Sequence, residues 1–205
     1  MTAGPVIALK GVSKSFGPIE VLHGVDLALW PGTVHALIGE NGAGKSTTMK
    51  ILAGYQPASS GEVLLDGQPA QFTSLHDGEL AGIVMIHQEF NLAEQLTVEQ
   101  NIFLGRELTR GLLLDKAEMR RKTRAYLDRV ECDISPDALV SSLSNSDKQM
   151  VEIAKALSRD ARVLIMDEPT AVLTTRETEV LFKQVDALRS AGTAILFTSH
   201  KLDEV

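Results

Sequence analysis

The chain has 205 residues, a length that suits one domain with room for an inserted lobe. Hydrophobic residues make up 44% of it, an ordinary share for a globular core, so the composition excludes an intrinsically disordered chain. With 20 basic and 27 acidic residues the net charge is −7, which argues against a surface that coats nucleic acid.

Cysteine usage indicates a reducing compartment, and the hydropathy pattern indicates neither a secretion signal nor a membrane span. Cys132 is the only cysteine, so no disulfide can form within the chain. The first ten residues lack the basic start and the long apolar run of a secretion signal. No apolar run approaches the ~20 residues that cross a bilayer. We therefore expect a soluble, cytoplasmic protein.

The first 38 residues alternate short apolar runs with turns. Ile7 and Leu9 recur at period two, and so do Val25, Leu27 and Leu29, which predicts strands with one buried face. The stretch 30–33, Trp-Pro-Gly-Thr, is typical of a turn, and residues 63–67 predict a further strand that ends in a turn. We expect these strands to form an antiparallel sheet.

Residues 39–47 follow the apolar run 34–38 and precede a helix-prone stretch from Lys45 to Leu52. Gly39, four spacers and Gly44-Lys45-Ser46 make the phosphate-binding P-loop pattern, and strand–loop–helix is the context it requires. Glycines let successive N–H groups point at an anion, and the helix amino terminus adds its positive end. Lys45 is predicted to reach the β- and γ-phosphates, and the Ser46 hydroxyl suits Mg²⁺.

The alternative reading of this segment is a chance glycine-rich turn. The favoured reading is a nucleoside triphosphate site. It is formed by Gly39, Glu40, Asn41, Gly42, Ala43, Gly44, Lys45, Ser46 and Thr47.

Three later segments, 82–87, 163–166 and 193–198, are near-continuous apolar runs of strand length. Runs of this kind are typical of parallel strands covered on both faces. Between about Phe90 and Arg159 the spacing is instead helical, and no strand is expected there. We predict an α/β core interrupted by a helical lobe.

Two carboxylates, Asp167 and Glu168, end the apolar run 163–166. Polar groups at such a position lie in the crevice where open α/β sheets bind ligands. Asp167 is predicted to hold Mg²⁺, through water, and Glu168 to orient or deprotonate the attacking water. The alternative is a solvated strand end that begins a turn at Pro169. Gln88 and His200 follow the other two runs and are weaker candidates on spacing alone.

In order along the chain, these motifs resemble the ATPase subunit of ATP-binding cassette (ABC) transporters. The resemblance covers essentially the whole chain. It rests on Lys14-Ser15-Phe16-Gly17, the P-loop, Gln88, Leu143-Ser144, Asp167-Glu168-Pro169-Thr170 and Ser199-His200. Three further segments resemble the branch that imports ribose, xylose, galactose and related solutes. They are residues 89–92, 101–107 and 150–157.

The resemblance implies a P-loop NTPase (RecA-like) parallel core, residues 1–88 and 160–205, with an amino-terminal antiparallel part. A helical subdomain, 89–159, is inserted in it. In the family that the chain resembles, two cassettes close face to face and trap ATP between the P-loop of one and the signature segment of the other. The resemblance assigns adenine stacking to Phe16, with Trp30 as the less favoured alternative, and contact with Mg²⁺ and water to Gln88. It assigns the γ-phosphate to His200.

The signature segment departs from the family pattern. The usual Leu-Ser-Gly-Gly-Gln is Leu143-Ser144-Asn145-Ser146-Asp147 in this chain. Ser144 is kept and is expected to touch nucleotide and to cap a helix. Both glycines are absent, and Asp147 adds negative charge near a negative ligand or favours a helix amino terminus. We hypothesise that this signature serves a weak or non-hydrolysing site.

The resemblance implies an ATP hydrolase, with ATP and Mg²⁺, that energises import of a monosaccharide. The implied partners are a second cassette, membrane permease subunits and, indirectly, a solute-binding protein, and not nucleic acid. The implied location is the inner face of the cell membrane. The chain resembles an amino-terminal cassette that stops soon after its last motif, and an isolated fragment is expected to hydrolyse weakly. The alternatives are a cassette protein without a permease and a regulatory nucleotide-binding module.

Overall fold

The computed structural model describes residues 4–40 and 42–199, without the side chain of Leu75. It divides into two compact units. The first holds the described residues up to Ile86, Ala161–Pro169 and those from Val185 onward, and the second holds His87–Asp160 and Thr170–Gln184. This division puts residues 170–184 with the helices, whereas the sequence-based boundaries keep them in the core; those boundaries remain a prediction.

The first unit contains an antiparallel and a parallel sheet. Its elements are β1 (Ile7–Phe16), β2 (Ile19–Leu29), β3 (Val34–Ala36), α1 (Lys45–Leu52), β4 (Ser60–Leu65), β5 (Gln68–Ala70), α2 (Leu75–Leu80), β6 (Ile83–Ile86), β9 (Val163–Met166) and β10 (Ala194–Phe197). Helix α6 (Thr175–Ser190) begins in the second unit and ends in the first.

The antiparallel sheet has the strand order β2-β1-β4-β5, as expected for the amino-terminal region. Its central hairpin pairs Ile7 with Leu29 at one end and Phe16 with Ile19 at the turn. Bulges between these ends shift the register. Because β1 and β2 are long strands, the two ends of this hairpin lie far apart.

The parallel sheet has the order β3-β10-β9-β6, and each neighbouring pair of strands is parallel. Every residue of β9 and β10 is buried, which explains their unbroken apolar sequences. The carboxyl ends of parallel strands share one edge of a sheet, so the segments after β3, β9 and β10 all begin at that edge.

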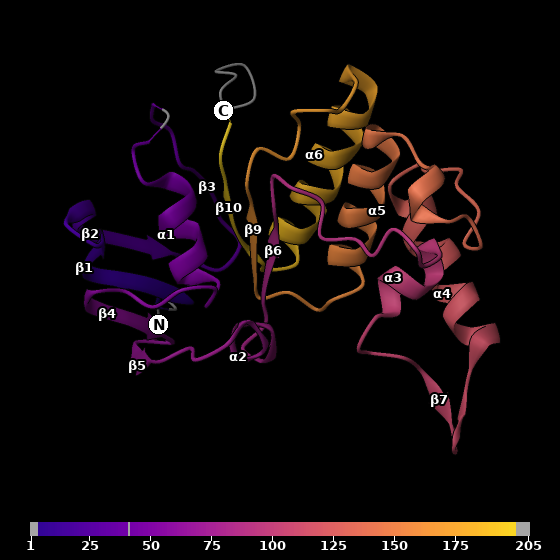
Figure 1. The fold of residues 1–205 in the computed structure, drawn as a ribbon, viewed down its shortest axis with the longest axis horizontal. Helices are drawn as coiled ribbons and strands as arrows, with labels where there is room; N and C mark the ends of the chain where they lie inside the picture. The colour runs from indigo at the N-terminus through magenta and orange to yellow at the C-terminus, as the bar shows by residue number, and fades with distance from the viewer. Residues whose placement is uncertain (1–3, 41, 200–205) are drawn as a thin grey trace. The chain divides into compact units, whose positions relative to one another are not determined.

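Helix α1 joins the two sheets through a common core. Its Met49, Ile51 and Leu52 are buried in one cluster with β1 residues and with Ile165 and Leu196 of the parallel sheet. Figure 1 shows α1 beside β1 and β2. Full burial of each such side chain contributes about 1.5–3 kcal/mol, so this packing anchors the segment that precedes the helix.

The second unit is mostly helical. Its elements are α3 (Val98–Phe103), β7 (Thr109–Arg110), β8 (Leu113–Leu114), α4 (Lys116–Arg129), the 3-10 turn η1 (Val140–Ser142), α5 (Asn145–Leu157) and the first part of α6. Helix α5 contacts both α3 and α4. On α4, Met119, Thr123 and Leu127 are buried, at the spacing of one helical face.

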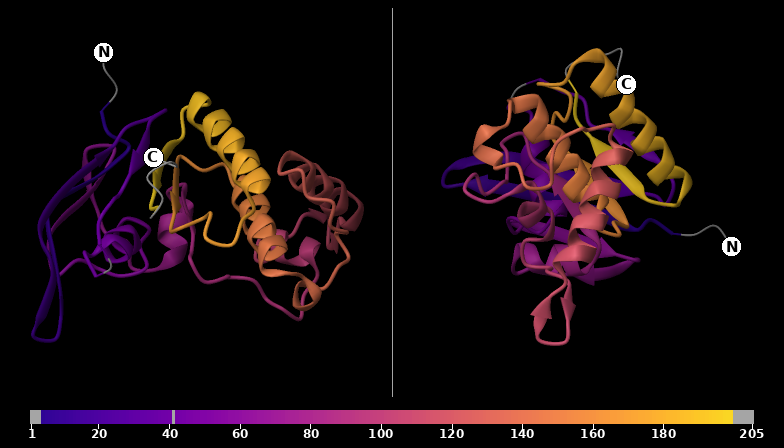
Figure 2. Two further views of the ribbon diagram at one scale, coloured as in Figure 1. Left: turned by 90° about the horizontal axis from the view of Figure 1, so that it is seen from above. Right: turned by 90° about the vertical axis from the view of Figure 1, so that its right-hand side faces the viewer.

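The sequence analysis expected no strand between residues 90 and 159, and that expectation is wrong. Strands β7 and β8, of two residues each, pair as a hairpin whose turn contains Gly111, with a φ of 68°. Strands this short carry no periodic signal that a sequence pattern could reveal. Figure 2 shows the hairpin extending away from α3 and α4 of its unit. In the part of the chain that the structure describes, no helix has the length and hydropathy to cross a bilayer.

Candidate nucleotide site

The loop between β3 and α1 has the backbone that a phosphate cradle needs. Gly42 and Gly44 have φ values of 84° and 85°, in the left-handed region that favours glycine. A Cβ atom added to Gly44 would collide with the Leu22 side chain of β2. The backbone angle therefore favours glycine at position 44, and any larger residue there would have to displace the Leu22 side chain.

The Lys45 ammonium lies over the start of this loop. Its Nζ donates hydrogen bonds to the carbonyl oxygens of Gly39 at 2.6 Å and Glu40 at 2.9 Å. An ammonium has three donors, so two such bonds leave one N–H for a phosphate oxygen. The sequence-predicted role of Lys45 is compatible with this placement.

The amino terminus of α1 faces the same loop. Gly44 is the N-cap, and no side chain of the described residues caps the helix. The first helical hydrogen bond runs from the Thr48 N–H to the Gly44 carbonyl at 2.9 Å. The N–H groups of Lys45, Ser46 and Thr47 therefore have no carbonyl within the helix and are available to an anion.

The two carboxylate residues lie at the end of β9, and a threonine at the end of β10 connects them. Thr198 Oγ1 donates to Asp167 Oδ1 at 2.9 Å and accepts a hydrogen bond from the Glu168 N–H at 2.9 Å. Thr198 is fully buried and Asp167 is 5% exposed. The hydroxyl therefore orients the Asp167 carboxylate and holds the backbone of Glu168.

Glu168 has a backbone conformation that non-glycine residues rarely adopt, with a φ of 49°. Such a conformation costs about 1–3 kcal/mol and persists only where the surroundings impose it. The hydrogen bond from its N–H to Thr198 and the following Pro169 are local constraints of this kind. Backbone strain at Glu168, which follows β9 at the carboxyl-end edge of the parallel sheet, favours a functional role for this residue over a solvated turn.

Thr198 was missed by the sequence reasoning. The available signal was a polar residue at the end of an apolar strand, directly before Ser199-His200. Its partners lie 31 and 30 positions earlier in the chain. Only the pairing of β9 with β10 brings them together.

The two candidates for adenine stacking, Phe16 and Trp30, lie near opposite ends of β2. The Gly32 N–H donates to the Gly192 carbonyl, so the turn at 30–33 lies where β10 begins, opposite the P-loop edge. Phe16 lies at the β1–β2 turn, two pairs beyond the pair that contains Leu22, and Leu22 packs against Gly44. Trp30 is roughly 25 Å from Leu22 along the strand. Phe16 is 49% exposed, so it is not a core residue. The Lys14 ammonium lies over its ring, with Nζ 5.2 Å from the ring centre.

Four sequence-predicted residues do not belong to the described part of the first unit. Gln88 and Ser144 belong to the second unit. Asn41 and His200 lie outside the described residues. The roles predicted for these four residues remain predictions.

In the second unit, the unusual signature residues have partners of their own. Ser144 is the N-cap of α5, and it forms a reciprocal capping box with Asp147. Ser144 Oγ donates to Asp147 Oδ2 at 2.7 Å and accepts the Asp147 N–H at 3.1 Å. Ser146 Oγ donates to Glu177 Oε1 at 2.7 Å. The expected helix cap is therefore present, and Asp147 is one half of it.

Glu177 ties this helix start to the beginning of α6. Its Oε2 accepts hydrogen bonds from the Thr174 N–H and hydroxyl, each at 2.7 Å. Burial raises the pKa of Glu177, but the hydrogen bonds from Ser146 and Thr174 outweigh it, so the net pKa is lowered. The carboxylate form is the one that both hydroxyls bind.

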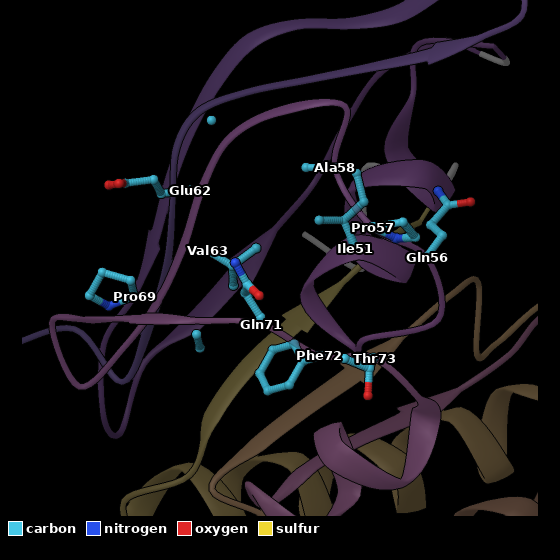
Figure 3. A pocket seen from close by; sticks show the side chains of 12 residues that line it. Ile51, Gln56, Pro57, Ala58, Glu62, Val63, Pro69, Gln71, Phe72 and Thr73 are labelled. Atoms are coloured by element: carbon cyan, nitrogen blue, oxygen red, sulfur yellow. The ribbon is translucent and has the colours of Figure 1, made fainter.

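A cavity of about 520 Å³ lies elsewhere in the first unit (Figure 3). It is lined at the carboxyl end of α1 by Ile51 and on the other side by Val63 and Phe72, with Glu62 as its single carboxylate. The P-loop precedes the amino end of α1. The cavity is therefore separate from the phosphate site and gathers no reactive pair of side chains.

The oxygen donors at the loop edge fit Mg²⁺. Ser46 offers a hydroxyl and Asp167 a carboxylate, and hard cations prefer such ligands. Over residues 4–40 and 42–199, no group of three or more His, Cys, Asp or Glu side chains could hold a metal by itself. A magnesium ion would therefore take its remaining ligands from phosphate oxygens and water, as it commonly does.

The loop, the helix terminus and the carboxylates place the chain in the class of P-loop proteins. Within this class, the ABC transporter family matches residues 22–171 of the chain. The chain belongs to that family.

Two relatives resemble the chain closely. It is 53% identical over 200 residues to the ribose import ATP-binding protein RbsA of Chromobacterium violaceum, covering 97% of this chain and 40% of that protein. It is 53% identical over 204 residues to a putative ribose/galactose/methyl galactoside import ATP-binding protein of Burkholderia ambifaria, covering 100% and 40%. The chain thus spans about two fifths of these relatives. The resemblance to the monosaccharide-import branch is confirmed.

Solved cassettes share the fold. A nucleotide-free ATP-binding cassette from an ABC transporter superposes with a TM-score of 0.84 at 25% identity, covering 98% of this chain and 83% of that one. A dimeric cassette in a post-hydrolysis state with ADP and Pi gives 0.86 at 25% identity, covering 97% and 89%. The expected α/β P-loop class, with its parallel core and antiparallel part, is confirmed.

Proposed function

We propose that this chain binds ATP with Mg²⁺ and hydrolyses it to energise import of a monosaccharide such as ribose through a membrane ABC transporter. The observation that carries the proposal is the shared edge of the parallel sheet. There, the Lys45 ammonium over the P-loop and the Asp167–Thr198–Glu168 junction follow strands of one sheet. The named relatives support the choice of sugar import.

The proposed chemistry is attack of water on the γ-phosphorus of ATP, with cleavage of its bond to the β–γ bridging oxygen. Loop N–H groups and Lys45 bind the phosphates and balance the negative charge that builds on their oxygens. Mg²⁺, when bound, would neutralise β- and γ-oxygens while Ser46 and Asp167 hold it. Glu168 orients the water and takes its proton as the new P–O bond forms.

Other predicted groups complete this proposed site. Phe16 stacks on adenine, Gln88 contacts the water and Mg²⁺, and His200 holds the γ-phosphate. Ser144 contacts the nucleotide held by a second cassette, which we propose as a partner together with membrane permease subunits and, indirectly, a solute-binding protein. The proposed location is the inner face of the cell membrane. No nucleic acid partner is proposed, because the net charge of −7 disfavours one.

Glu168→Gln tests the chemistry in the assembled transporter. We expect ATP turnover to fall by about 100-fold or more, because the amide cannot accept the proton, with the Kd for Mg-ATP unchanged. Glu118→Gln is the matched control, since Glu118 is an α4 residue paired with Arg121. Turnover that survives Glu168→Gln would rule out the proposed base. ATP-dependent uptake of labelled ribose into vesicles tests the transport assignment separately.

A further inference from the structure

The segment that follows Gln88 has no regular secondary structure, yet side chains of α5 hold its backbone. Glu152 Oε1 accepts the Asn91 N–H at 2.7 Å, and Lys155 Nζ donates to the Asn91 carbonyl at 2.9 Å. Glu152 is 6% exposed and Lys155 is 8% exposed. Two buried, oppositely charged groups thus bind the backbone N–H and the backbone carbonyl of one loop residue.

A third residue of the same helix face extends this contact. Lys148 Nζ lies 2.8 Å from Glu94 Oε1. Lys148, Glu152 and Lys155 are spaced by four and three positions, so they form one stripe along α5. The stripe runs against residues 91–94.

The far end of the segment is held from α3. Asn101, which is fully buried, accepts the Ala93 N–H at 2.7 Å and donates to the carbonyls of Ala93 and Thr97 at 3.0 Å each. Backbone groups of residues 91–97 are therefore bound by two helices of the same unit. A loop restrained in this way moves with those helices.

Burial makes the Glu152 contact costly. Desolvation raises the pKa of Glu152, while the Lys155 charge and the Asn91 N–H oppose that rise. Both charged groups are bonded to the Asn91 backbone, and removing one of two buried, hydrogen-bonded charges is destabilising.

We propose that Lys148, Glu152 and Lys155 are positioning residues that link the Gln88 segment to the signature end of α5. Gln88 lies three residues before Asn91, and Ser144 lies one helical turn before Lys148. A shift of either end is then passed to the other. The inference rests on the proposed function, which assigns Gln88 to the attacking water and Ser144 to nucleotide. A misplacement of about 1 Å at such a group costs about 100-fold in rate.

The decisive experiment is a double-mutant cycle of Glu152→Ala and Gln88→Ala in the assembled transporter. We expect each single variant to lower kcat by at least about 10-fold with the Kd for Mg-ATP unchanged, because water positioning and not binding is lost. Since Glu152 acts through Gln88, the double variant should be no slower than Gln88→Ala. Glu152→Gln keeps an oxygen acceptor and should recover most of the rate.

Additive losses in the cycle, or a loss that appears only in Kd, would overturn the link while leaving the ATPase function intact. A normal rate in Gln88→Ala would overturn both the role of Gln88 and the link. Failure of wild-type protein to hydrolyse ATP would instead defeat the proposed function itself. Glu118→Gln serves as the unchanged control on α4.

A charge swap keeps the test open if Glu152→Ala does not fold. Glu94→Lys or Lys148→Glu alone should lower kcat, and the two together should restore it. Hydrogen exchange gives a readout without turnover: Glu152→Ala should speed exchange of the Asn91 amide by at least about 10-fold, and that of Ala93, bound by Asn101, far less. Absence of rescue by the swap contradicts the link, and so does an unaltered Asn91 amide in folded Glu152→Ala protein.

Discussion

Thr198 Oγ1 donates a 2.9 Å hydrogen bond to Asp167 Oδ1, and the same oxygen accepts the Glu168 N–H. Two neighbouring residues with different proposed roles thus depend on one buried hydroxyl from the adjacent strand. Neither carboxylate residue is oriented by its own strand alone.

Thr198→Val should therefore damage both stability and turnover. The change preserves shape but leaves the Glu168 N–H and a largely buried Asp167 oxygen without this partner, at a cost of about 1–3 kcal/mol. We expect ATP turnover to fall by at least about 10-fold, measured beside chemical denaturation curves. Thr198→Ser keeps the hydroxyl and loses only the methyl group. Equal behaviour of the two variants would mean that the hydroxyl does not orient the site.

The signature substitutions give a second prediction. Ser146→Gly combined with Asp147→Gln brings the segment closer to the family pattern, and glutamine at position 147 still completes a capping box with Ser144. If the charge near phosphate weakens the site, turnover of the assembled transporter should rise several-fold. Ser146→Gly alone is the control for loss of the Glu177 contact. Unchanged turnover in the double variant would contradict our hypothesis of a weak site.

Replacement of Gly44 tests whether the backbone and packing of the P-loop are needed for binding. Gly44→Ala should weaken Mg-ATP binding by at least about 10-fold, because the residue has a φ of 85° and its new methyl group meets Leu22. Gly67→Ala is the matched control, with a φ of 75° and open space around the added atom. Calorimetry should show normal affinity in that control. Normal binding by Gly44→Ala would show that the collision relaxes harmlessly.

Cys132 provides a pH-dependent prediction. Burial raises the pKa of its thiol from 9.0 to about 11, although a backbone hydrogen bond from Ile134 opposes this shift. Between those pH values the unfolded thiol loses its proton while the folded one keeps it. The free energy of unfolding should therefore fall as pH rises from about 9 to about 11, and Cys132 should not affect its pH dependence below that window.

Iodoacetamide labelling measures the same property, because only the thiolate reacts. At pH 8.5 folded protein should react at least about 10-fold more slowly than protein in denaturant. Cys132→Ala should remove the fall in stability above pH 9. Equal labelling rates in folded and unfolded chains would show that the thiol is not shielded.

The P-loop and the strand-end carboxylates could be predicted because their signals are contiguous. Residues 34–52 contain strand, loop and helix in one stretch, and the backbone angles of Gly42 and Gly44 follow from local sequence. The position of Asp167 and Glu168 after a fully buried strand follows from the same kind of pattern. Hydrophobic continuity predicted the parallel sheet for the same reason.

The tertiary structure adds a positional reason to prefer Phe16 over Trp30, beside the family resemblance that already preferred Phe16. Both aromatic residues are partly exposed and lie near strand ends in the sequence. What separates them is the hairpin register and the Gly32–Gly192 hydrogen bond, which puts Trp30 at the opposite sheet edge. Neither follows from a local pattern.

The sequence by itself determined the family, the phosphate loop and the residues proposed for chemistry, because each depends on neighbours along the chain. Only the folded chain revealed that Thr198 joins the carboxylates, that Glu177 binds Ser146, and that Glu152 holds Asn91. These contacts join residues 31 to 61 positions apart. Hydrogen bonds have short reach and strict direction, so such partners are chosen by strand pairing and helix packing, which no single stretch of sequence encodes.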